Sequence, residues 1–424
     1  MKKFTKQETS WALYDWGNSA YSIIITTAVF PLFYKSAAAN AGIANEDSTA
    51  YLGYTIAIFT FILALIGPIL GTIADYEGMK KKFFAFFFTL GVAFTAGLAF
   101  VPADNWLLLL IFYTFAALGS TGANVFYDAF LTDVTDEKRM DRVSARGYSL
   151  GYIGSTIPFL ISIAIIMLAQ FEIIPVSMTN ASRIAFIITA IWWGLFAIPM
   201  FKHVRQQYFI KREPSPVAQS FKRLGNTFKD IRKHRTIFMF LLAYFFYIDG
   251  VGTIINMSTA YGTDLGLNST TLLIALFVTQ VVAAPFALLY GRLAGKFGIK
   301  SMLYVGIFVY IIVCTYAFFM DSAVDFWILA MLVATSQGGI QALSRSYFAQ
   351  IIPKQNANEF FGFYNIFGKF ASIMGPILVG VTAQLTGSSS YGVFSLVILF
   401  IVGLVILTRV PEPQKVPEAE PIAS

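Results

Sequence analysis

The sequence GTIADYEGMKKK at residues 71–82 joins two long apolar runs, and a second copy, GRLAGKFGIK, follows at residues 291–300. Glycines in each copy allow a turn with positive φ between two helices. The basic residues after each turn favour water or headgroups over hydrocarbon. The repeated loop therefore indicates a duplicated membrane protein.

The composition agrees with a protein whose main solvent is lipid. Of 424 residues, 57% are hydrophobic and only 12% are charged, and the mean hydropathy is +0.68. These values exclude an ordinary soluble domain. The net charge of +7 could suggest a nucleic-acid partner, but no basic face with interleaved aromatic residues supports one. The single cysteine, Cys314, excludes a disulfide framework.

Twelve apolar runs are long enough to cross ~30 Å of hydrocarbon. They cover residues 14–35, 51–74, 83–102, 106–131, 146–170, 182–201, 237–260, 271–294, 301–320, 326–348, 360–385 and 391–408. The predicted fold is an all-α membrane protein of twelve transmembrane helices in two parallel six-helix repeats. The expected units are a half at 1–201, a basic cytoplasmic linker at 202–236, a half at 237–409 and a disordered tail at 410–424.

The distribution of basic residues predicts the orientation. Assigning alternate loops to one side gathers all of the 30 Lys and Arg residues there except Lys35 and Arg183. Basic loops stay in the cytoplasm. We therefore expect both termini to be cytoplasmic.

Two sets of motifs resemble known transporters. Gly71, Asp75, Gly78 and Lys80 resemble the signature between helices 2 and 3 of the major facilitator superfamily. The segments YDWGNSAY at 14–21, YIDG at 247–250 and EFFG at 359–362 resemble its autophagy-related vacuolar effluxer-like branch. This resemblance implies the major facilitator fold, transport as the activity, and the plasma (inner) membrane for a bacterial-type member. Fungal members are associated with amino-acid efflux from the vacuole. Gly295 replaces the acidic residue in the second loop copy.

Two charged residues lie near the predicted membrane midplane. Asp249 is about twelve residues into helix 7, and Lys369 is about ten residues into helix 11. An unpaired charge at that depth costs at least ~2.5 kcal/mol. We expect Asp249 to bind the coupling ion, and Lys369 to hold a substrate carboxylate or to pair with Asp249 when the site is empty. The alternative is a permanent structural ion pair, but desolvation can cancel its attraction.

Other polar residues project from the same set of helices. Amide side chains that could contact the solute or the coupling ion, or could only join neighbouring helices, are Asn18, Asn124, Asn256, Asn365, Gln337 and Gln341. Candidate gate residues near the cytoplasmic boundary are Asp15, Asp75, Asp128, Arg142, Arg146 and Arg345. Asp75 could face the positive N-terminus of helix 11, Arg142 or Arg146.

These features predict a secondary active transporter that moves a small solute, such as an amino acid, by alternating access. H⁺ is a candidate coupling ion. Two alternatives stay open: efflux of amphipathic compounds such as drugs or bile-like molecules, and a membrane scaffold or sensor that no longer transports. No nucleotide-binding loop or G-x-S-x-G elbow indicates an enzyme. We expect a monomer in the bilayer with no cofactor, no metal site and no nucleic-acid partner.

Overall fold

A computed structural model describes residues 3–211, 234–264, 269–320 and 322–411. These residues contain 12 helical spans long and apolar enough to cross a membrane, as the sequence predicts. Most of the predicted linker and tail, residues 212–233 and 412–424, lies outside the described residues.

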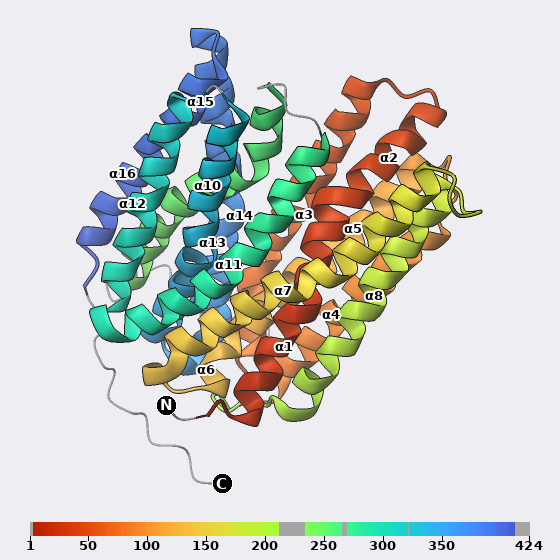
Figure 1. The fold of residues 1–424 in the computed structure, drawn as a ribbon. Helices are drawn as coiled ribbons and strands as arrows, with labels where there is room; N and C mark the ends of the chain where they lie inside the picture. The colour runs from red at the N-terminus through yellow and green to blue at the C-terminus, as the bar shows by residue number, and fades with distance from the viewer. Residues whose placement is uncertain (1–2, 212–233, 265–268, 321, 412–424) are drawn as a thin grey trace.

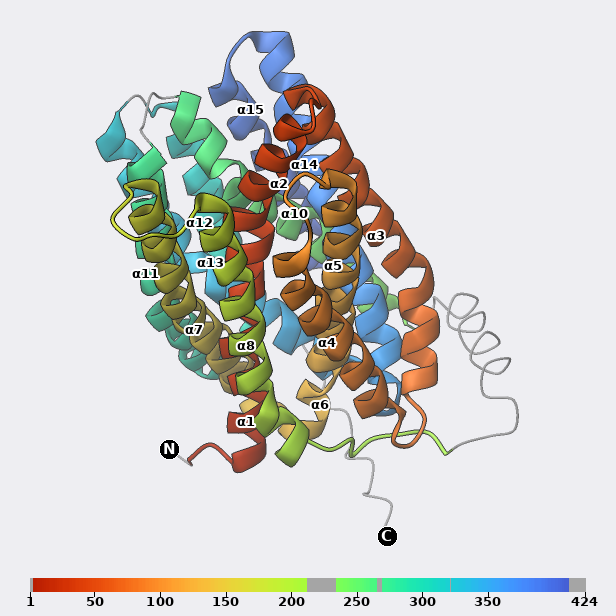
Figure 2. The same cartoon turned by 90° about the vertical axis from the view of Figure 1, so that its right-hand side faces the viewer.

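The first half holds six spans (Figures 1 and 2). Its elements are α1 Lys6–Ala20, the π-helix η1 Tyr21–Ala28, α2 Val29–Asn40, α3 Asn45–Ala74, α4 Met79–Gly97, the 3₁₀ turn η2 Leu98–Phe100, α5 Trp106–Ala129, α6 Leu131–Val134, α7 Glu137–Gln170 and α8 Met178–His203. The elements α1, η1 and α2 follow one another without a break and form the first span.

The second half repeats the arrangement. Its elements are α10 Arg235–Asp264, α11 Ser269–Phe297, α12 Ile299–Phe318, α13 Ala323–Ile351, the 3₁₀ turn η3 Lys354–Asn356, α14 Ala357–Thr386, α15 Ser389–Ser395 and α16 Val397–Thr408. The short α15 and α16 together make up most of the last span, Ser390–Thr408.

Two helices begin earlier than the apolar runs predict. Helix α1 starts at Lys6 because Thr5 and Glu8 form a capping box there, and α7 starts at Glu137 because the Asp136 side chain accepts the N–H of Arg139. Hydropathy marks only the part of a helix that crosses hydrocarbon. Caps of this kind instead satisfy the first N–H groups of a helix that continues into water.

The two halves meet mainly along two seams. Helix α3 packs against α14, while α7 packs against α11 and α13. At the first contact, a Cβ on Gly71 would collide with the carbonyl oxygen of Asn358. At the second, a Cβ on Gly291 would lie 2.5 Å from the Cβ of Ala145. The first glycine of each repeated loop therefore permits close packing between the halves.

Both contacts lie at one end of the bundle. This end carries the start of α1, the loop between α3 and α4, and the end of α8, and it lies at the lower edge of Figures 1 and 2. We call it the basic end, because the predicted basic loops gather there.

Candidate functional site

An ion cluster, which we call the central cluster, joins the halves. Arg345 on α13 lies 3.1 Å from the Asp128 carboxylate on α5 and 3.5 Å from the Asp15 carboxylate on α1. It also donates to the Ser144 hydroxyl and carbonyl oxygens on α7, at 3.0 and 3.1 Å. Only 3% of the Arg345 side chain is exposed, against 13% for Asp15 and 14% for Asp128. The carboxylates are therefore the more accessible part of the cluster.

Aromatic rings fix the position of this arginine. Its guanidinium lies 4.7 Å from the ring of Trp11, 5.6 Å from Tyr127 and 4.4 Å from Tyr148. Cation–π attraction of this kind strengthens when water is excluded. The Tyr127 hydroxyl also donates to Asp15 at 2.8 Å. The cluster thus holds two carboxylates and one guanidinium, which leaves one negative charge without a balancing cation inside it.

Two residues of the cluster occupy corresponding positions in the two repeats. Asp128 and Arg345 are 217 residues apart, the same separation as that of Gly151 and Gly368, which occupy matching positions in the two repeats. Equivalent positions in the two repeats therefore carry opposite charges, and those charges pair where the repeats meet.

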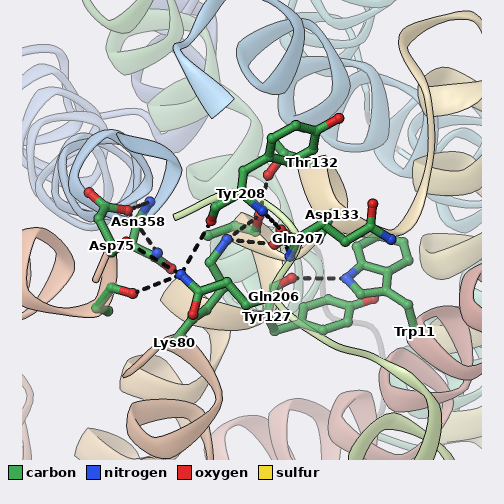
Figure 3. A network of polar contacts seen from close by, with 12 residues as sticks. Trp11, Asp75, Lys80, Tyr127, Thr132, Asp133, Gln206, Gln207, Tyr208 and Asn358 are labelled. Atoms are coloured by element: carbon green, nitrogen blue, oxygen red, sulfur yellow. Dashed lines mark hydrogen bonds and ion pairs between the residues drawn. The ribbon is translucent and has the colours of Figure 1, made fainter. Parts of the chain in front are cut away.

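Asp75 joins the halves nearer the basic end. Its carboxylate accepts the backbone N–H groups of Asn358 and Glu359 at 2.9 and 3.4 Å, and the Asn358 side-chain amide at 2.8 Å (Figure 3). These donors begin α14, whose helix dipole places partial positive charge there. The structure therefore places Asp75 at the helix N-terminus, the first of its three expected partners.

Arg142 and Arg146 lie elsewhere. Both sit on the outer face of α7, where they line a groove with Arg292 of α11. Neither contributes one of the described hydrogen bonds or ion pairs to Asp75. The suggestion that they pair with Asp75 therefore has no support in this conformation.

A buried ion pair fixes the loop that follows Asp75. Lys80 lies 2.6 Å from Asp133 on α6, and neither side chain is exposed. The other Asp133 oxygen accepts the backbone N–H groups of Gln207 and Tyr208 at 2.7 and 2.9 Å. Neighbouring Lys81 donates to the carbonyl groups of Phe201 and Val204 at the end of α8. Two of the three lysines in this loop are thus structural, and only Lys82 is exposed.

The beginning of the predicted linker crosses this loop. Residues 204–211, which we call the strap, form a parallel bridge between Ile210 and Tyr76. Gln206 donates to the carbonyl oxygens of Ala74 and Asp75 (Figure 3). The described start of the linker therefore packs on the signature loop.

Asp249 is buried inside the second half. Its Oδ1 atom accepts the N–H of Gly375 on α14 at 2.9 Å and the Thr253 hydroxyl at 3.5 Å. A Cβ on Gly375 would overlap the Thr253 hydroxyl, so this approach requires glycine. Within the described part of the chain, the Asp249 Oδ2 atom has no hydrogen-bond partner. An unpaired carboxylate oxygen among apolar groups is costly, and binding a proton would reduce that cost.

Lys369 does not pair with Asp249 in this structure. The Lys369 side chain is exposed, whereas Asp249 is 0% exposed. Asn365, one turn earlier on α14, lies within hydrogen-bonding reach of Asp128 in the other half. Residues four apart share a helix face. Lys369 therefore shares a face of α14 with Asn365, and no described carboxylate forms an ion pair with it.

The remaining amide candidates have different surroundings. Asn18 donates to Asn124 at 2.9 Å within the first half. Gln341 lies 3.5 Å from the Tyr152 hydroxyl on α7 and so spans the two halves. Gln337 borders a mostly apolar pocket of about 70 Å³ in the second half. The side chain of Asn256 lies outside the described part of the structure.

The sequence identifies candidate residues more readily than their partners. It did not single out Asp133, Ser144 or Asn358, although each makes a hydrogen bond that fixes a candidate residue. Asp133 follows Asp128 by five residues at the end of an apolar run. That position could have suggested a buried acid, but it fits an acid exposed to water equally well.

The twelve membrane spans of the described residues form two halves joined by ion pairs, which is the architecture of a major facilitator transporter. The protein XylE, a proton:xylose symporter, has this fold with a TM-score of 0.71 at 13% sequence identity, over 96% of each chain.

Sequence comparison gives the family. The chain belongs to the family described as "Vacuole effluxer Atg22 like", whose model matches residues 4–420. It is 73% identical to the MFS-type transporter YxiO of Bacillus subtilis (strain 168), over 97% of this chain and 96% of that protein. It is 21% identical to autophagy-related protein 22 of Eremothecium gossypii, over 97% and 92% of the two chains.

The buried Lys80–Asp133 pair gives a stability prediction. Lys80→Ala leaves the Asp133 carboxylate buried without its cation, which should lower the free energy of unfolding by about 3–5 kcal/mol. SDS-induced unfolding of the purified protein measures this change. Lys82→Ala removes the same charge from an exposed position and should change stability by less than about 0.5 kcal/mol. Equal losses in the two variants would contradict the role given to the pair.

Proposed function

We propose that the protein is a secondary active transporter for a small amphoteric solute, with amino acids as the solute class. One observation carries this proposal: the exposed cation Lys369 lies one turn of α14 from Asn365, which reaches the partly exposed Asp128. One helical turn is ~5.4 Å, so these two side chains project from neighbouring positions on one face of α14. A solute carboxylate would bind Lys369, and its ammonium group would offset the unbalanced charge beside Asp128.

This proposal changes the partner of Lys369. The sequence suggested that Lys369 holds a substrate carboxylate or pairs with Asp249 in the empty site, but Asp249 is enclosed within the second half and bonded to Gly375. We assign Asp249 the coupling role alone, with H⁺ as the ion. Its unpaired oxygen supports this role, because taking up and releasing a proton would change its hydrogen bonding to α14.

We also propose that the basic end is cytoplasmic and that the structure represents an outward-facing state. Lys and Arg residues gather at that end, as the positive-inside rule requires. The contacts of Asp75 and Arg345 close it, so Lys369 is reached from the opposite side. In the alternate state, the contacts of Asp75 with α14 would break.

Lys369→Met tests the solute site. Thermal-shift screening of the purified protein first compares amino acids with amphipathic cations and anions. We expect amino acids to stabilise the protein, and Lys369→Met to weaken binding of the best one at least tenfold and to abolish its counterflow in proteoliposomes. Lys82→Met is the matched control and should transport normally. Unchanged binding by Lys369→Met would remove this residue from the site, and stabilisation by amphipathic compounds alone would refute the solute class.

Asp249→Asn tests coupling. The amide should retain counterflow, because exchange requires no net proton movement, but it should lose accumulation driven by a pH gradient. Asp104→Asn, at an exposed position, should leave accumulation unchanged. Accumulation by Asp249→Asn at the wild-type rate would show that this carboxyl carries no coupling proton.

Asp75→Ala tests the gate. Removing the carboxylate frees the N-terminus of α14, so the basic end should open more often while solute affinity changes little. The measure is thiol labelling of Ala357→Cys, a buried position at the start of α14, in a Cys314→Ser background. We expect faster labelling with Asp75→Ala than with the control Asp104→Ala. Labelling that stays at the control rate would rule out a latch at Asp75.

A further inference from the structure

A groove of about 560 Å³ opens at the outer seam between α7 and α11. Four arginines line it: Arg139, Arg142 and Arg146 from α7, and Arg292 from α11. No carboxylate is among its lining residues in the described part of the chain. We call it the arginine groove. Its residues take no part in the central cluster or in the contacts of Asp75.

Helix geometry brings these charges together. Arg139, Arg142 and Arg146 follow one another at spacings of three and four residues, which places them on one face of α7. Gly291 then allows α11 to approach: a Cβ there would lie 3.5 Å from the Cα of Arg142. Arg292 is the next residue in the chain, so the second half adds its arginine beside those of the first.

The arginines differ in how their charge is compensated. Arg139 lies 2.7 Å from the Glu8 carboxylate. Arg146 lies 4.2 Å from the ring of Phe4 and donates to the Thr9 hydroxyl at 3.2 Å. Arg142 and Arg292 are exposed, and neither makes a hydrogen bond or ion pair with another described residue. The two uncompensated cations thus come from opposite halves.

Like charges across a seam oppose its closure. Closing the basic end brings Arg142 and Arg292 toward each other, and an anion between them would convert the repulsion into attraction. Guanidinium groups match phosphate oxygens in charge and bidentate geometry. The chemistry of the groove therefore selects a phosphate-bearing anion.

The surroundings favour a lipid as the source of that phosphate. Leu150 and Leu288 line the inner part of the groove. Beyond them, Ile153 and Ile157 continue the same face of α7 and are 41% and 39% exposed, while Leu289 on α11 is 41% exposed. Arg146 to Ile157 spans ~16 Å of helix, enough to receive an acyl chain below a headgroup held by the arginines.

We propose that the arginine groove binds an anionic phospholipid, whose phosphate bridges Arg142 and Arg292 and stabilises the closed basic end. The acyl chains lie along Ile153, Ile157 and Leu289. Basic pockets between transmembrane helices are suited to anionic headgroups. The site is separate from the solute site, so its binding does not depend on which solute is transported.

Lipid binding to the full-length protein in detergent tests this proposal. Phosphatidylglycerol should raise Tm and give bound-lipid peaks in native mass spectrometry, whereas phosphatidylcholine should do neither to the same extent. The variant Arg142→Gln/Arg292→Gln should bind phosphatidylglycerol about 30-fold more weakly. The single variant Arg292→Gln should show a smaller loss and provides a second measurement if the double variant is unstable.

The control variant also removes two positive charges from the basic end. Lys138→Gln/Lys296→Gln replaces two exposed lysines outside the groove lining and should bind phosphatidylglycerol like the wild type. Equal binding by the two double variants would overturn the proposal. Glycerol 3-phosphate distinguishes a lipid phosphate from a soluble one. If it displaces phosphatidylglycerol with an affinity equal to that of the lipid, the groove is a site for soluble anions and the lipid assignment is wrong. Counterflow is not used as a readout, so failure of the transport proposal leaves this result unaffected.

Discussion

At the basic end, the contact between α3 and α14 depends on the Asp75 carboxylate meeting the first N–H groups of α14. Those N–H groups have no partner inside their own helix, and Asp75 is 1% exposed. The contact therefore gives the N–H groups an acceptor and gives the buried carboxylate its donors. The absence of a side chain at Gly71 lets the helices approach closely enough for the bonds to form. Around this contact, Lys80 fixes the loop to Asp133, and the strap covers it.

The central ion cluster lies further into the bundle and has a different character. Arg345 is buried and held by three aromatic rings, but its two carboxylate partners keep part of their surface accessible. A cluster with one excess negative charge can respond to a cationic group, whereas the fully buried Lys80–Asp133 pair cannot. The buried pair thus fixes a rigid loop, whereas the carboxylates of the central cluster stay partly exposed.

The duplication explains the contrast between the two seams. At the α3–α14 seam, the first loop copy contributes Asp75, which binds a helix N-terminus directly. At the α7–α11 seam, the second copy has Gly295 in place of that acid and contributes Arg292 to a groove of arginines. One seam is held by its own residues, whereas at the other Arg142 and Arg292 pair with no described residue.

The sequence by itself determined the twelve spans, the repeat and the family. The length of the apolar runs, the glycine-turn motifs and the YDWGNSAY segment at residues 14–21 are local properties of the chain. It also selected Asp75, Asp128 and Arg345 as notable charges. Only the tertiary structure decided their partners. Asp249 and Lys369 look alike in sequence, as single charges at similar depth, yet one faces Gly375 inside its half and the other is exposed on the face of α14 that it shares with Asn365. Lys80 and Lys82 differ by two residues, but one is buried and the other exposed. The direction of a side chain depends on how helices rotate against one another, and that rotation is set by contacts between residues far apart in the chain.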